Sequence, residues 1–117
     1  SIQEKSGYSN QYGILADLLR DEKGDFFQLK SGIQLPAGDY KITHILSENL
    51  EQTEAKVQIY CYGEVKEEKQ LLMRKSEEAT VMQYQIKVPE DSEWEFVLQL
   101  QETCPYTEKI FIQKVVK

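Results

Sequence analysis

The chain has 117 residues, of which 40% are apolar and 10% aromatic, so it is long enough for one domain with a single hydrophobic core and too short for two. Its formal net charge of −6 argues against nucleic acid and against an anionic membrane surface as partners, because both are bound through an excess of Lys and Arg. The sequence contains no run of about 18 apolar residues, and we therefore expect no membrane insertion by this segment.

The cysteines and the histidine do not form a recognisable metal motif. Cys61 and Cys104 lack the spacing of zinc ligands, and His44 is the only histidine, which leaves a zinc site too few ligands. We therefore expect no metal and no cofactor. Two interpretations of the cysteines remain open: a disulfide, if their strands are neighbours, or two buried thiols. We expect His44 at the surface or at a strand end, because no residue near it in sequence completes a base or a ligand set.

The chain starts with a polar, turn-rich segment up to residue 11. In residues 12–20 the apolar side chains have helical spacing, and Asn10 before them is a suitable N-cap. We expect a short helix there, with a first strand of the β domain as the alternative, because short apolar runs do not separate the two. We divide the chain into an N-terminal extension over residues 1–24 and a β domain over residues 25–117.

The strongest structural signal is the Pro-Ala-Gly-Asp segment at residues 36–39. Its proline sets φ for the first corner of a turn, its glycine accepts a positive φ at no steric cost, and its aspartate can bond back to nearby backbone. We predict strands at residues 25–30 and 33–35 before this turn. Tyr40 then begins the alternation of a half-buried core strand.

Alternation of apolar and polar residues predicts further strands at residues 56–62, 80–88, 94–101 and 109–116. Residues 63–79 are rich in helix formers but have too few apolar residues for a helical stripe. We therefore predict a hairpin there, with a short edge strand at its Leu-Leu-Met run that lysines protect from aggregation. The residues expected in the core are Val57, Ile59, Met82, Ile86, Trp94, Phe96, Leu98, Ile110 and Ile112.

About eight short strands without long helices between them predict an all-β fold, an antiparallel two-sheet β-sandwich. The Leu-Pro-Ala-Gly-Asp-Tyr-Lys-Ile segment at residues 35–42 resembles the LxxGxYxh segment (h apolar) of galactose-binding-like domains and carbohydrate-binding modules. The resemblance covers roughly residues 26–117. It implies a jelly-roll sandwich that is not catalytic, is usually extracellular, and binds glycans or sits beside another domain. Members of these families often hold a calcium ion, but no acidic cluster here matches such a site.

The outward residues of the predicted strands form a surface of amides and tyrosines. Side-chain amides donate to and accept from sugar hydroxyls, and aromatic faces stack on the apolar face of a sugar ring. The alternative interpretation is an ordinary solvated face. The two interpretations can be distinguished only if these strands share one concave sheet. The candidate ligand-binding residues are Gln58, Tyr60, Tyr62, Gln83, Gln85, Gln99 and Gln101 on strands and Tyr106 in a loop.

We do not expect an enzyme, because the sequence has no Gly-x-Ser-x-Gly elbow, no phosphate-binding loop and no His-Glu-x-x-His motif. The expected function is that of an extracellular or cell-surface binding module with a glycan as its ligand. The alternative is a structural or protein-interaction accessory domain of a larger surface protein. The first residue is Ser1 rather than Met, which is compatible with a place in such a larger chain.

Overall fold

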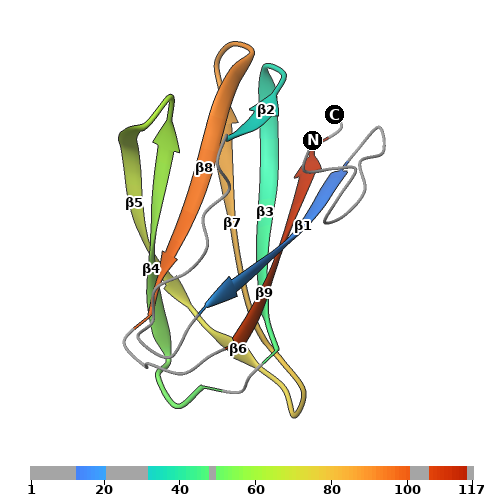
Figure 1. Ribbon diagram of the computed structural model, residues 1–117, viewed down its shortest axis with the longest axis vertical. Coiled ribbons are helices and arrows are strands. Elements are labelled where there is room, and N and C mark those ends of the chain that lie inside the picture. Colours follow the sequence, from blue (N-terminus) through green and yellow to red (C-terminus); the bar gives the residue numbers. More distant parts are fainter. Residues whose placement is uncertain (1–12, 21–31, 48–49, 101–105, 116–117) are drawn as a thin grey trace.

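The computed structural model describes residues 13–20, 32–47, 50–100 and 106–115, with the backbone alone at residues 13–20 and 106–108 (Figure 1). This part of the chain is all-β. Its strands are β1 (Gly13–Arg20), β2 (Ile33–Leu35), β3 (Gly38–Leu46), β4 (Glu54–Cys61), β5 (Glu64–Leu72), β6 (Arg74–Lys75), β7 (Thr80–Val88), β8 (Ser92–Gln99) and β9 (Tyr106–Lys114). The strand predicted at residues 25–30 lies outside the described residues.

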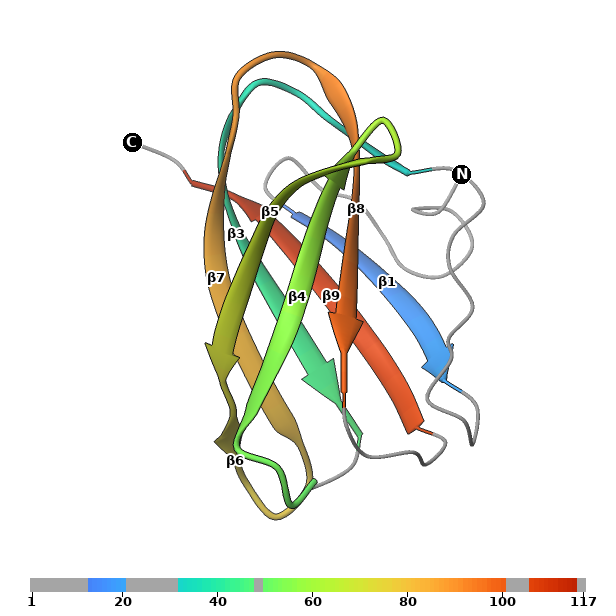
Figure 2. The ribbon, with the colours of Figure 1, turned by 90° about the vertical axis from the view of Figure 1, so that its left-hand side faces the viewer.

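The strands form two antiparallel sheets that pack face to face. Sheet A has the order β1-β9-β3-β7-β6 and sheet B the order β2-β8-β4-β5. Figure 2 looks onto sheet B, with the strands of sheet A behind it. The pairing is nested: β1 pairs with β9, β2 with β8, β3 with β7 and β4 with β5. This is the strand order of a jelly roll, and it confirms the predicted antiparallel two-sheet sandwich.

The core lies between the two sheets and contains every residue that alternation placed there. Strand side chains point alternately to the two faces of a sheet, so the apolar set of each strand faces the other sheet. Val57 is fully buried and Leu98 is 1% exposed, one from each of two neighbouring strands of sheet B. The predicted core residues that are confirmed as buried are Val57, Ile59, Met82, Ile86, Trp94, Phe96, Leu98, Ile110 and Ile112.

The predicted change of direction is confirmed as a bend at residues 36–37, which carries the chain from sheet B to sheet A, whereas Gly38 and Asp39 already belong to β3. Gly38 has φ +151°, and a Cβ on it would lie 2.9 Å from Cε of Lys114. The Tyr40 hydroxyl donates to the carbonyl of Pro36 at 2.6 Å. The Ala37 amide donates to Oδ1 of Asp91 at 2.9 Å, which joins this turn to the turn between β7 and β8.

Three expectations from the sequence need correction. The helix predicted at residues 12–20 is wrong: residues 13–20 form β1, which pairs along its whole length with β9. A short apolar run does not decide between helix and strand, and a neighbouring strand with free backbone groups settles the choice. In residues 63–79 the absence of a helix is confirmed, but the edge strand β5 has nine residues instead of being short.

His44 is the third correction, because it is fully buried instead of lying at the surface. It sits in the middle of β3, which has β7 on one side and β9 on the other, and its side chain is on the face that points into the core. Its Nε2 lies 2.7 Å from the Tyr84 hydroxyl, and the two rings stack with centroids 5.4 Å apart. The hydrogen bond compensates for burying two polar groups among apolar side chains.

A candidate ligand groove between the sheets

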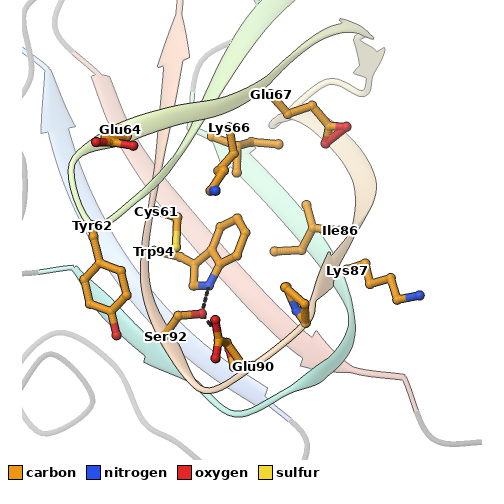
Figure 3. Close-up of a pocket in the computed structure, with 12 residues that line it drawn as sticks. Cys61, Tyr62, Glu64, Lys66, Glu67, Ile86, Lys87, Glu90, Ser92 and Trp94 are labelled. Carbon is orange, nitrogen blue, oxygen red and sulfur yellow. Dashed lines mark hydrogen bonds between the residues drawn. The ribbon is translucent and has the colours of Figure 1, made fainter.

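A groove of about 580 Å³ opens between β5 of sheet B and β7 of sheet A, beside the β4–β5 hairpin (Figure 3). We call it the hairpin groove. Its floor is mainly apolar and consists of Ile59, Cys61, Ile86, Ser92 and Trp94. Its rim carries Tyr62, Glu64, Lys66, Glu67, Lys87, Pro89 and Glu90. The groove thus combines a mainly apolar floor with a strongly charged rim, and ligand sites commonly combine an apolar lining with polar groups that fix the ligand's orientation.

The indole of Trp94 is held in a fixed orientation at this floor. Its N–H donates to Oγ of Ser92 at 2.7 Å, and the Ser92 hydroxyl donates to the carbonyl of Glu90 at 2.6 Å. Trp94 is 5% exposed and Ser92 3% exposed, so this chain of hydrogen bonds is shielded from water. Cys61, which is paired with Trp94 across β4 and β8, is half-buried beside it and carries a free thiol.

Tyr62 stands at the rim on a backbone conformation that tyrosine rarely adopts. It has φ +50° and Gly63 has φ +80°, so the two residues form the type I′ turn of a tight hairpin. The left-handed conformation costs a residue with a Cβ about 1–2 kcal/mol. The Tyr62 amide donates to the carbonyl of Glu93 at 3.0 Å, and the side chain is 64% exposed. The fold thus accepts strain to hold an aromatic side chain in solvent.

An irregularity in β5 adds a cation to the rim. The pairing with β4 runs from Ile59 opposite Glu67 directly to Tyr60 opposite Val65, so Lys66 is an extra residue in a β-bulge. Bulges redirect side chains and are frequent beside ligand sites. In Figure 3 the Lys66 ammonium points into the groove, towards the ring of Trp94.

The predicted ligand-binding residues do not form one surface. Gln58 and Tyr60 on β4 and Gln99 on β8 lie on the outer face of sheet B, whereas Gln83 and Gln85 on β7 belong to sheet A on the opposite side of the sandwich. The prediction of a shared amide and tyrosine face is therefore wrong in this respect, because β7 and β8 follow one another in sequence but join different sheets. Tyr62 lies at the rim of the hairpin groove. Tyr106 was expected in a loop, but its backbone begins strand β9 and pairs with β1. Its side chain and Gln101 lie outside the described part of the chain.

The members that share sheet B are engaged with one another. The Tyr60 hydroxyl donates to Oε1 of Gln58 at 2.8 Å, and Nε2 of Gln58 donates to Oε2 of Glu68 on β5 at 2.7 Å. Below them lies a hollow of about 370 Å³ on the outer face, where Lys56 is flanked by Gln70 and Gln99 on the neighbouring strands. Of the predicted ligand-binding amides, Gln99 lines this hollow.

Sequence reasoning missed the hairpin groove because its walls come from four strands. Trp94 was correctly placed in the core, but its position beside the open edge depends on the pairing of β8 with β4. One signal was available: the Tyr62-Gly63 pair between two strands occupies the place where Asn-Gly is usual, and an aromatic residue in that place is unexpected.

Comparisons with known proteins leave the family open. No protein-family model matches the chain, and no curated protein matches it. In the part of the chain that the structure describes, no group of three or more His, Cys, Asp or Glu side chains is arranged to hold a metal ion. The same residues contain no helix long and apolar enough to span a membrane.

Proposed function

We propose that the protein is a non-catalytic, extracellular or cell-surface module that binds a glycan in the hairpin groove. The observation that carries this proposal is Tyr62, an exposed aromatic side chain held at the rim in a costly conformation. Strained residues persist where the surrounding structure enforces them, and they cluster at ligand sites. A tyrosine there offers a flat apolar face to a sugar ring and a hydroxyl to its polar edge.

The remaining groove residues supply the polar contacts that a sugar needs. The carboxylates of Glu64 and Glu90 accept hydrogen bonds from hydroxyl groups, and the Lys66 ammonium donates them. The volume of about 580 Å³ falls within the usual range of ligand sites. The burial of His44 in the core supports a binding role over catalysis, since the only histidine of the chain is then not among the residues that line the groove and cannot serve there as a general base.

The jelly-roll topology also supports the resemblance of residues 35–42 to galactose-binding-like domains and carbohydrate-binding modules. A shared fold does not establish a shared function, so membership of either family is part of the proposal. What the groove adds is a specific place and specific residues for the ligand.

A glycan panel of plant, host and bacterial oligosaccharides tests the proposal, with two variants at the rim. Tyr62→Phe keeps the aromatic face and should retain binding, whereas Tyr62→Asn keeps the turn, removes the ring and should lower affinity at least about tenfold. Gln83→Ala, on the outer face of sheet A, is the control and should bind as the unchanged protein does. Absence of binding to every glycan at millimolar concentration, or full binding by Tyr62→Asn, would overturn the proposal.

A second function, an accessory domain that docks another protein, is favoured by one observation. Val65 and Leu72 are 50% and 72% exposed, and both lie on β5, whose outer edge is free in sheet B. Edge strands with exposed apolar side chains are sites of strand addition, although lysines such as Lys66 and Lys69 guard against it. If this is the function, replacing Val65 and Leu72 together by Thr should abolish association with the neighbouring domain or partner and leave glycan binding unchanged.

A further inference from the structure

We infer that the hairpin groove selects sugars that carry a carboxylate, and that Lys66 is the residue that selects them. This inference rests on the proposed function, because it specifies the ligand of the same groove. It is carried by the β-bulge, by the ionic surroundings of Lys66 and by the position of its ammonium above the apolar floor.

The bulge decides where the Lys66 side chain points. In a regular strand successive side chains alternate between the two faces, and the partners Gln58 and Glu68 on the outer face of sheet B follow this rule. Insertion of one extra residue interrupts the alternation between Glu67 and Val65. Lys66 consequently enters the groove between the sheets, where Figure 3 shows its ammonium pointing towards Trp94.

The ammonium of Lys66 has no ionic partner among the described residues. Its neighbour Lys69 lies 3.6 Å from Glu67, which is thereby engaged, but no ion pair joins Lys66 to Glu64, Glu67 or Glu90. Lys66 and all three glutamates are exposed and line the rim of the groove. The groove therefore presents one unpaired ammonium that points towards its floor, and carboxylates along its border.

This distribution of charge distinguishes between ligands. A ring seated against Trp94 displaces water from the Lys66 ammonium, and a charge that loses its water without gaining a partner is costly. A carboxylate on the ligand supplies that partner through a charge-assisted hydrogen bond. The rim carboxylates stay in contact with solvent, which screens their repulsion, and they accept the ligand's hydroxyl groups. A neutral sugar donates hydrogen bonds to the rim carboxylates but leaves the Lys66 ammonium without an ionic partner.

The test is calorimetric titration of the full chain with two matched pairs of probes. One pair is 3′-sialyllactose and lactose, and the other is a galacturonic acid trimer and its methyl ester. In the unchanged protein at least one acidic probe should bind about tenfold more tightly than its neutral counterpart, and the preference should shrink as NaCl rises from roughly 0.05 to 0.5 M. Lys66→Gln should bind both members of that pair equally.

Lys75→Gln is the matched control, because it removes the same charge from an exposed position on β6, which does not line the groove. It should keep the preference for the acidic probe. If the probes or other glycans bind but acidic and neutral forms bind equally, or if Lys66→Gln keeps the preference, the inference is wrong while glycan binding in the groove stands. If no glycan binds, the proposed function fails and the inference fails with it.

Discussion

Tyr62 occupies a turn position at which asparagine or glycine would make the folded protein more stable than tyrosine does. Both residues of a type I′ turn need a positive φ, which asparagine and glycine adopt at little cost. Tyr62 has φ +50° and is 64% exposed, so it gains little burial in return for its conformation. A residue that weakens the fold at an exposed place is a reasonable sign of a functional side chain.

Tyr62→Asn should therefore raise the free energy of unfolding by about 1 kcal/mol, because asparagine relieves the left-handed strain. Urea unfolding followed by Trp94 fluorescence measures the change. Tyr62→Ala is the control: alanine lacks the short polar side chain through which asparagine tolerates the left-handed conformation, and it should bring no comparable gain. A loss of stability in Tyr62→Asn would show that the tyrosine stabilises the hairpin by contacts, and the functional argument from strain would then lapse.

The buried pair of His44 and Tyr84 is the second feature at this scale. Its 2.7 Å hydrogen bond lies in the core, where an unmade bond costs more than at the surface. Tyr84→Phe should lower the free energy of unfolding by about 1–3 kcal/mol. In Tyr60→Phe, which loses a half-buried bond to Gln58, water can replace the hydroxyl and the loss should be smaller. Equal losses in the two variants would contradict this account of the core pair.

Among the elements, β8 is the most deeply embedded strand of sheet B. It lies between β2 and β4, and it buries Trp94, Phe96 and Leu98 on its inner face and Val97 on its outer face. Leu98→Ala should cost about 2–5 kcal/mol in unfolding free energy, as deletion of a fully buried leucine side chain does. The neighbouring Gln99→Ala should stay within about 0.5 kcal/mol, because Gln99 is exposed. A loss below about 1 kcal/mol for Leu98→Ala would mean that its face is wrongly assigned.

The strands that were predicted well are those with one buried and one exposed face. β4 and β7 alternate cleanly, so their sequences contain both the strand and the identity of its inner face. β1 has pairs of adjacent leucine and isoleucine side chains instead of alternation, and its strand character depends on the partner β9. β5 was predicted too short because an edge strand exposes residues on both faces and its sequence therefore resembles a charged loop or helix.

At the scale of the whole molecule, most of the described strands were predictable but their division between the sheets was not. Hydrogen bonds between strands far apart in sequence decide that division, and periodicity within one strand contains no information about them. This is why Gln83 and Gln99 were placed on one surface and lie on two. It is also why the hairpin groove, in which Cys61 and Trp94 meet across strands, could not be foreseen.

The β2–β3 turn and the β7–β8 turn are joined at one end of the sandwich, and the stability of this region depends on pH. Burial raises the pKa of Tyr40 above its ordinary value of about 10, and the Asp91 carboxylate adds to this effect. The folded state then holds the phenol proton more tightly than the unfolded state, so the stabilisation is complete below pH 10 and is lost as the pH rises through the pKa of the folded protein.

Above about pH 10 the unchanged protein should thus lose stability more steeply than Tyr40→Phe, which has no phenol to titrate. Asp91→Asn should lie between them, since it can still accept the hydrogen bond from the Ala37 amide but lacks the charge. Urea unfolding at a series of alkaline pH values gives the three slopes. Parallel slopes would show that Tyr40 does not contribute to alkaline unfolding.

The nested pairing of the strands has a consequence for the order in which the chain folds. β4 and β5 are joined by two residues, whereas β1 and β9 bring Gly13 opposite Gln113, and each doubling of the closed loop adds about 0.6 kcal/mol of entropy cost. We expect the β4–β5 hairpin to form first and β1–β9 to close last, so Ile59→Val should slow folding and Ile112→Val should mainly speed unfolding in stopped-flow experiments. In this order the rim bearing Tyr62 and Lys66 forms before β8 adds Trp94, so the contacts that a ligand makes at the rim precede the floor that completes the site.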